Sequence, residues 1–168
     1  ENIRYNEFLD LFGEEGNVIV IAVQDSLFFT PTKRNAWREL NSKINAFSEI
    51  NLVLSTDNLQ ELVKDEKKQE FRLEEVQLST AKDSASITKF KEKLFLELPF
   101  YNNLIFDKET NTLRSVIYMN PDIVNTAKRK DFIFDRFIPL IESFEKESSS
   151  DVHVSGMPYI RTLNAQNI

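Results

Sequence analysis

The sequence predicts an α+β fold built on two strongly apolar strands, each followed by an amphipathic helix. The first strand is the run NVIVIAVQ at residues 17–24, which is the longest apolar stretch and is rich in β-branched residues. The second is the segment LRSVIYM at residues 113–119. Because the first run shows no polar alternation, we expect a central strand that is covered on both faces of a sheet.

Segments with helical periodicity lie before and after the first strand. Residues 5–12 carry apolar side chains at positions i, i+3, i+4 and i+7, which predicts a short lead-in helix that ends at Gly13. After the strand, Thr30 and Pro31 are typical of a helix start, with the Thr30 hydroxyl as the cap, and a helix is predicted over residues 32–47. The apolar stripe of this helix consists of Trp37, Leu40, Ile44 and Phe47.

The middle of the chain is predicted to be an exposed, mainly helical insertion at residues 56–103. A short strand at residues 50–54 precedes it and returns beside the first strand in a right-handed βαβ unit. Within the insertion, residues 59–63 are interpreted as a weak helix start before a charged stretch. A clearer helical stripe stops at Pro99. The members of that stripe are Ile87, Phe90, Leu94 and Leu98.

The last third of the chain repeats the βαβ pattern. A polar link at residues 107–112 joins a short strand at residues 104–106 to the second apolar strand, as in a β-hairpin. A long helix is predicted at residues 124–146, with a kink at Pro139. A short strand at residues 152–154 completes the pattern.

Two βαβ units in one chain predict a single antiparallel sheet of the ferredoxin-like split βαβ type. Numbered along the chain, the strands should lie in the order 4-1-3-2, which places the strong strands in the middle and the short ones at the edges. Both long helices should then cover one face. The chain forms one domain, composed of a lead-in (1–16), a first βαβ unit (17–55), the insertion (56–103), a second βαβ half (104–158) and a trailing segment (159–168).

Charge and composition exclude several classes of site. The net charge is −6, and the lysines are interleaved with acidic residues, so we expect no nucleic-acid partner. The chain has no cysteine, which excludes disulfides and cysteine nucleophiles. No segment approaches the roughly 20 apolar residues of a membrane span. Because glycine-rich phosphate loops and calcium loops are also absent from the sequence, we predict no metal and no other cofactor.

Catalytic groups are equally sparse. The only histidine, His153, lies in a predicted edge strand without partners for a catalytic triad. Glu14 with Glu15 and Asp131 with Asp135 come closest to paired carboxylates, and we interpret both pairs as solvated charges, so we expect no enzymatic activity. Fourteen phenylalanines, against one Trp and four Tyr, instead indicate either an aromatic core or a surface that meets apolar matter.

Three short motifs follow one another along the chain. FG at residues 12–13 precedes the first strand, Asp25 is followed by LF at residues 27–28, and GMP stands at residues 156–158. With the segment LPFYNNLIFDKETNTLRSVIYMN between the last two, the whole chain resembles the first extracytoplasmic loop of the resistance-nodulation-division superfamily. It is most similar to the exporter branch related to the mycobacterial large membrane proteins and the hopanoid transporters.

The resemblance implies a porter domain on the periplasmic side of the inner membrane, tethered by membrane helices before Glu1 and after Ile168. Glu1 is also an unusual first residue, so we expect the chain to be a piece of a longer protein. The implied function is to receive lipidic or amphiphilic small molecules and pass them on. The proton relay of such exporters lies in the membrane helices, so the domain has no chemistry of its own. A homo-oligomer is compatible with the resemblance.

Aromatic residues at the end of the insertion are the predicted substrate-facing wall. Phe95, Phe100 and Tyr101 gather around the break at Pro99. The main alternative to a porter domain is a free-standing ferredoxin-like module that binds a small ligand or regulates another protein, because a fold does not fix a function. A hydrolase is a third and poorer interpretation.

Overall fold

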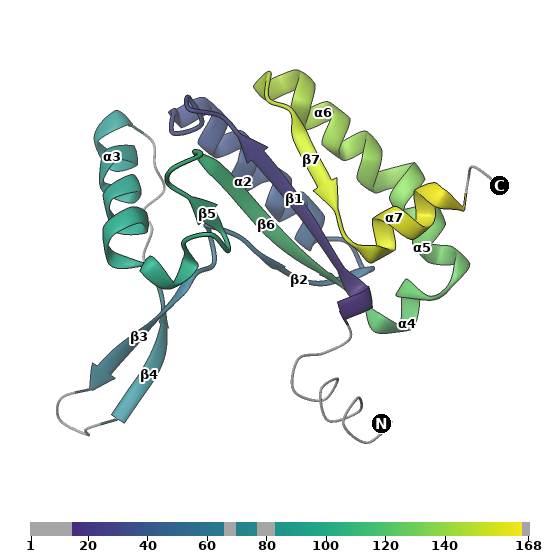
Figure 1. Cartoon of the computed structure of the whole chain (residues 1–168), viewed down its shortest axis with the longest axis horizontal. Helices are drawn as coiled ribbons and strands as arrows, with labels where there is room; N and C mark the ends of the chain where they lie inside the picture. Colours follow the sequence, from purple (N-terminus) through teal and green to yellow (C-terminus); the bar gives the residue numbers. More distant parts are fainter. Residues whose placement is uncertain (1–14, 66–69, 77–82, 166–168) are drawn as a thin grey trace.

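The computed structural model describes residues 15–65, 70–76 and 83–165. Within them the fold is mixed α+β, with a five-stranded antiparallel sheet and a separate two-stranded hairpin (Figure 1). The lead-in helix expected at residues 5–12 lies outside the described residues.

The described elements follow one another in the predicted general order. The strands are β1 (Val18–Gln24), β2 (Ile50–Leu54), β3 (Gln60–Asp65), β4 (Glu70–Glu75), β5 (Phe106–Asp107), β6 (Thr112–Met119) and β7 (Val152–Ser155). The α-helices are α2 (Pro31–Asn45), α3 (Ser84–Glu92), α4 (Pro121–Val124), α5 (Ala127–Phe132), α6 (Ile138–Ser148) and α7 (Met157–Asn164). The 3-10 turns are η1 (Glu15–Asn17) and η3 (Pro99–Tyr101), and the π-helical turns are η2 (Lys93–Glu97) and η4 (Ile133–Phe137).

The main sheet has the strand order β2-β6-β1-β7, and β5 also pairs with β6. β1 and β6 run antiparallel along the whole of β1, from Val18 opposite Tyr118 to Gln24 opposite Thr112. β7 pairs antiparallel with β1, and β2 pairs antiparallel with β6. The two strongest strands are therefore neighbours at the centre, and the expected order of the four predicted strands is confirmed.

One face of the sheet forms the core, and the other does not. Ile19, Ile21 and Val23 of β1 are fully buried, whereas the alternate residues Val18 and Val20 are half-buried. Helices α2 and α6 contact each other on the buried face (Figure 1). The expectation that β1 is covered on both faces is therefore wrong for the described residues. The physical reason is that two right-handed crossovers in such a sheet place both helices on the same side.

The aromatic core is centred on Trp37, which has no exposed surface. Its ring lies edge-on to Phe28 at 5.6 Å and to Phe144 at 5.7 Å, measured between ring centroids. These contacts join the loop after β1, helix α2 and helix α6. Much of the phenylalanine excess is thus core packing. The buried phenylalanines are Phe28, Phe90, Phe106, Phe132, Phe137 and Phe144.

The start of α2 differs from its prediction in one detail. The helix begins at Pro31, but the side chain of Thr30 makes no capping hydrogen bond. Thr30 contributes its carbonyl instead, which accepts from the Arg34 amide at 2.9 Å. The expected capping hydroxyl is therefore wrong, although the position of the helix start is right.

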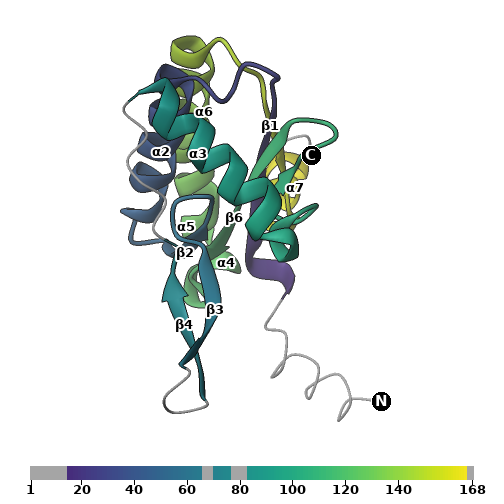
Figure 2. The same cartoon turned by 90° about the vertical axis from the view of Figure 1, so that its left-hand side faces the viewer.

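The insertion at residues 56–103 is not mainly helical, because its first half forms the β3–β4 hairpin. Figure 2 shows this hairpin extending below α3, away from the main sheet. Two contacts with the later part of the insertion hold its base. The hydroxyl of Tyr101 donates to the Gln60 carbonyl at 2.7 Å, and Lys93 pairs with Glu61 at 3.2 Å. The predicted helix start at residues 59–63 is wrong, since these tertiary contacts and cross-strand pairing outweigh weak local periodicity.

Two of the later helical segments contain a π-helical turn shortly before a proline. α3 passes into the π-helical turn η2 before Pro99, and the stripe predicted to stop there is buried. The helix expected over residues 124–146 is divided into α4, α5, η4 and α6. Pro139 lies in the first turn of α6, directly after η4. A proline removes one backbone donor and crowds the carbonyl four residues earlier, which explains an irregular turn at the expected kink.

Gly156 has a geometric role between β7 and α7. Its φ of 116° lies in a region that other residues rarely adopt. A Cβ atom built on it would lie 2.2 Å from the carbonyl oxygen of Val18. The chain therefore needs glycine here to turn closely past β1, and buried Pro158 lies in the first turn of the last helix.

The buried position of Trp37 predicts its contribution to stability. Trp37→Ala should lower the free energy of unfolding by about 3–5 kcal/mol, because it leaves a large cavity between α2 and α6. Urea titration measures this change. Phe71→Ala is the control, since the Phe71 side chain is 65% exposed and its loss should change stability by no more than about 0.5 kcal/mol. A loss below about 1 kcal/mol for Trp37→Ala would contradict the core assignment.

The two described glycines form a second pair of variants. Gly156→Ala should destabilise the fold by about 1–3 kcal/mol, because it combines an unfavourable φ with a backbone clash. Gly16→Ala places its Cβ in open space and should stay within about 0.5 kcal/mol of the parent. Thermal unfolding of both variants compares them directly. Equal midpoints would refute the close approach at Gly156.

Candidate functional site

The carboxylate of Asp25, directly after β1, joins three parts of the chain. It accepts hydrogen bonds from the Leu27 amide at 2.8 Å and from the Ser150 hydroxyl at 2.9 Å, and it pairs with Lys33. Lys33 also donates to Ser150 at 3.0 Å. The Asp25 carboxylate thus connects the end of β1 to the first turn of α2 and to the loop before β7.

The electrostatics of Asp25 follow from these partners. Partial burial raises the pKa of its carboxyl, but hydrogen bonds from Lys33, the Leu27 amide and Ser150 outweigh this effect and hold the pKa below its ordinary value. The group is therefore ionised at neutral pH. A charge-assisted cluster of this kind fixes the loop more firmly than neutral hydrogen bonds would.

The loop that Asp25 fixes sends neighbouring side chains in opposite directions. Phe28 is fully buried against Trp37, whereas Leu27 is 66% exposed. Phe29 points to the insertion, where its ring lies 5.5 Å from that of Phe95. The segment after β1 therefore supplies the core on one side and an apolar surface on the other.

A cleft of about 600 Å³ lies between this surface and α3 with its π-helical turn. Leu27, Phe29 and Phe95 give it apolar walls, and Leu96 is 76% exposed beside it. The ammonium of Lys91 lies 5.2 Å from the Phe29 ring centroid and 5.6 Å from that of Phe95, which is within cation–π range. The full lining is Ser26, Leu27, Phe29, Thr30, Ile87, Thr88, Lys91, Glu92, Phe95 and Leu96.

The three predicted site residues are not all in one place. Phe95 lines the 600 Å³ cleft, where it contacts Phe29 and Phe106. Phe100 and Tyr101 line a separate cleft of about 460 Å³ at the base of the β3–β4 hairpin. The Phe100 side chain is 80% exposed, while the Tyr101 hydroxyl is engaged with Gln60. The structure therefore divides the expected wall between two clefts.

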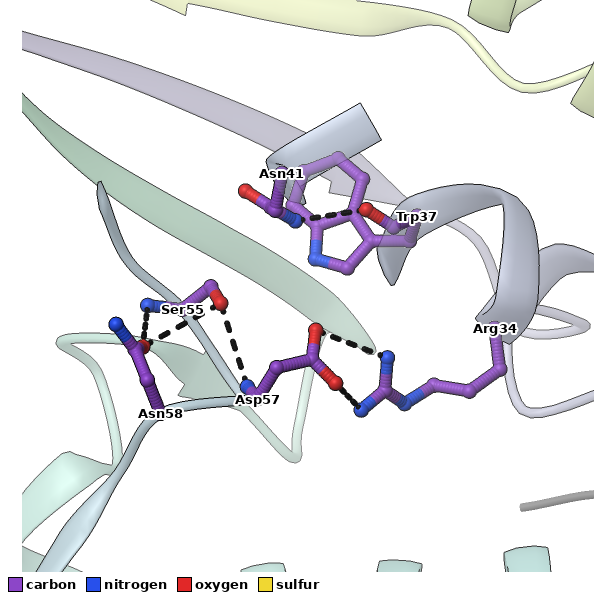
Figure 3. A network of polar contacts seen from close by, with 6 residues as sticks. All are labelled: Arg34, Trp37, Asn41, Ser55, Asp57 and Asn58. Carbon is purple, nitrogen blue, oxygen red and sulfur yellow. Dashed lines mark hydrogen bonds and ion pairs between the residues drawn. The ribbon is translucent and has the colours of Figure 1, made fainter. Parts of the chain in front are cut away.

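A third, polar cavity lies between α2 and the loop after β2. Its volume is about 260 Å³. Arg34 of α2 donates to both carboxylate oxygens of Asp57, and the Asn41 side-chain amide donates to the Trp37 carbonyl at 2.9 Å (Figure 3). Asn58 accepts from the Ser55 amide at 2.8 Å and so shapes the loop. This cavity had no counterpart in the sequence-based prediction.

Several buried polar atoms of α2 and of the loop after β2 have no hydrogen-bond partner within the described chain, and of their residues only Asn41 lines this cavity. They include the Asn41 side-chain oxygen, the Thr56 hydroxyl and the indole nitrogen of Trp37. An unsatisfied buried polar group costs about 1–3 kcal/mol. In Figure 3 the indole nitrogen points toward the loop that carries Ser55 and Asp57.

The other candidate groups are dispersed. His153 is exposed on β7 opposite Ala22, and Asp131 and Asp135 lie on α5 and η4. No cluster of three or more His, Asp or Glu side chains suited to a metal ion occurs in the described part of the chain. Across the same residues, none of the helices combines the length and apolarity needed to cross a membrane. No protein-family model matches the chain, and no curated protein matches its sequence.

The Asp25 cluster predicts a pH-dependent term in stability. Because the folded pKa lies below the ordinary aspartate value of about 4, the contribution is complete above about pH 4 and is lost as pH falls through the folded pKa. Asp25→Asn should therefore cost about 1.5–3 kcal/mol at pH 7 and progressively less toward about pH 2.5. Urea midpoints across this range measure the difference between the two proteins.

The control for this prediction is Asp151→Asn, which removes the same charge from an exposed position one residue after Ser150. It should change the free energy of unfolding by at most about 0.5 kcal/mol at pH 7. A difference between the parent and Asp25→Asn that stays constant from pH 7 to the acid limit would contradict the role of the ionised carboxylate.

Proposed function

We propose that this chain is an extracytoplasmic porter domain of a resistance-nodulation-division type exporter, which receives a lipidic or amphiphilic molecule and passes it on. The observation that carries the proposal is the cleft between the loop after β1 and α3. Its volume of about 600 Å³ lies in the usual range for small-molecule sites. Exposed leucines at such a cleft favour an apolar ligand over a polar one.

The motifs behind the resemblance have roles consistent with the proposal. Asp25 orients Leu27 and Phe28, so the motif at residues 25–28 builds one wall of the cleft. Gly156 and Pro158 turn the chain from β7 into α7. The motif at residues 25–28 thus lies at the proposed site, and the motif at residues 156–158 lies at the turn into the last helix.

We also propose that the sheet is a ferredoxin-like split βαβ sheet with an insertion that combines the β3–β4 hairpin and α3. Four observations support it: the strand order, the antiparallel pairings, the two helices on one face and the crossovers between β1 and β2 and between β6 and β7. In a porter domain the sheet would form the rigid side of the cleft, because a cleft that releases its ligand by moving one wall needs the other wall to stay fixed.

The ends of the described chain also suit a domain attached to a membrane on one side. The first described element, η1, contacts the last helix, α7. A domain carried between two membrane helices needs its two ends close together. Energy coupling would belong to those membrane helices, so the domain itself needs only to bind and release.

Titration with a fluorescent fatty acid, 11-(dansylamino)undecanoic acid, tests the proposed cleft. Saturable binding is expected with a Kd of roughly 10 μM to 1 mM, because a ligand that must be released is held by only ~4–7 kcal/mol. Leu27→Ala should weaken binding by about three- to tenfold, since it removes apolar contact area without opening the core. Absence of saturable binding up to the solubility limit of the probe would refute the proposal.

The matched variant Phe100→Ala separates the two apolar clefts. Phe100 is also exposed and apolar, but it lines the cleft at the hairpin base. Its replacement should leave the Kd unchanged. Weakening by Phe100→Ala but not by Leu27→Ala would move the site to the hairpin base, and nanomolar binding of a polar metabolite would favour a regulatory module instead.

A further inference from the structure

We propose that the cleft at the base of the β3–β4 hairpin binds a quaternary ammonium group, such as that of choline. The cleft has a volume of about 460 Å³ and shares no lining residue with the apolar cleft beside the loop after β1. Binding at this second site is therefore independent of the proposed exporter function. The lining includes Glu61, Glu97, Leu98, Pro99, Phe100 and Tyr101.

Two aromatic rings form a corner in this cleft. The rings of Phe100 and Tyr101 lie nearly at right angles, with an interplanar angle of 85° and 5.2 Å between their centroids. A cation in such a corner can contact the electron-rich faces of both rings, and aromatic corners of this kind recognise quaternary ammonium groups. The geometry of the pair therefore favours a cationic ligand over a neutral one.

The backbone of this corner is held in place by the hairpin and by the turn η3. The Tyr101 hydroxyl donates to the Gln60 carbonyl at 2.7 Å and accepts from the Gln60 amide at 3.1 Å. The Tyr101 amide donates to the carbonyl of buried Leu98 at 3.1 Å. Phe100 lies between these two anchored residues, and its side chain is 80% exposed. A turn that is already ordered loses little conformational freedom on binding.

Carboxylates give the surroundings of the cleft a negative charge. Glu97 lines the cleft, is exposed and forms no ion pair within the described residues, whereas Glu61 is paired with Lys93 at 3.2 Å. None of the described lining residues is basic. Glu75, the cross-strand partner of Gln60, adds a further negative charge to the hairpin. The ligand should therefore carry a positive charge.

The apolar part of the lining distinguishes a quaternary ammonium from a primary one. A primary ammonium carries three donors and is strongly hydrated, so it needs several acceptors. The Gln60 carbonyl already accepts from the Tyr101 hydroxyl. A trimethylammonium group has no donor, and it can place its methyl groups against Pro99 and the two rings while its charge faces Glu97.

Titration of the folded chain with choline chloride tests the site, and the neutral isostere 3,3-dimethyl-1-butanol is the matched ligand. The ¹H–¹⁵N signals of the Phe100 and Tyr101 amides should shift saturably with choline, with a Kd of roughly 1–10 mM. The isostere has the same shape without the charge, so it should bind at least about fivefold more weakly. Added sodium chloride should weaken the binding of choline but not that of the isostere.

Two pairs of variants locate the ligand. Glu97→Gln should weaken choline binding about three- to tenfold, whereas Glu142→Gln removes the same charge from an exposed position on α6 and should leave the Kd unchanged. Phe100→Leu keeps an apolar side chain but removes the ring face, so it should weaken binding about three- to fivefold. Phe71→Leu is its control at the outer end of the hairpin. Far-ultraviolet circular dichroism confirms that all four variants are folded.

A soluble short-chain lipid, dihexanoylphosphatidylcholine below its micelle concentration, identifies the source of the ammonium group. Tighter binding of this lipid than of choline would assign the cleft to a lipid head group. Equal or weaker binding of the lipid would assign the cleft to a free organic cation.

Three outcomes would overturn the proposal. The first is the absence of a saturable shift up to about 50 mM choline. The second is equal binding of choline and its neutral isostere, and the third is an unchanged Kd in both Glu97→Gln and Phe100→Leu. Failure of fatty-acid binding at the apolar cleft would affect none of these results, because the two clefts have no wall in common.

Discussion

A partly buried charge at the end of the central strand fixes the loop that connects the core to the cleft. Asp25 is surrounded by donors from its own loop, from α2 and from the loop before β7. Its position decides that Phe28 enters the core and that Phe29 faces the insertion. The Asp25 carboxylate thus connects the core to the cleft, because the loop that it holds carries Phe28 into the core and Phe29 toward the insertion.

Much of the sheet could be predicted from the sequence, because apolar strands of unequal length have few good arrangements. The apolar run of β1 and the alternation in β6 indicate central strands, and the short β2 and β7 belong at the edges. The expected cover on both faces of β1 was wrong because it was inferred from hydrophobicity alone, whereas the crossovers place both long helices on one face. The β3–β4 hairpin was missed for another reason: its charged strands are held by Tyr101 and Lys93, which are distant in sequence.

The sites were less predictable than the fold. Phe95, Phe100 and Tyr101 were predicted to form one wall because aromatic residues gather around Pro99, but Phe95 lines one cleft and the other two line another. The exposure of Leu27 could not be predicted, because an aspartate before an apolar loop does not show which of the following side chains point outward. The polar cavity has almost no sequence signal. Its atoms come from a helix and a loop, and a buried asparagine oxygen without a partner is a property of three-dimensional packing.

The anchoring of the β3–β4 hairpin has a mechanical consequence. Its base is joined to η2 through Glu61 and Lys93 and to η3 through Tyr101, and η2 also carries Phe95 in the wall of the apolar cleft. The hairpin extends well beyond the sheet, and the contacts with Lys93 and Tyr101 hold it only at its base (Figure 2). A rotation of the hairpin about its base would move the Phe95 wall of the cleft. The opposite wall is the loop after β1, which Asp25 holds to the sheet. The hairpin base and the Phe95 wall of the cleft thus share one short segment, η2.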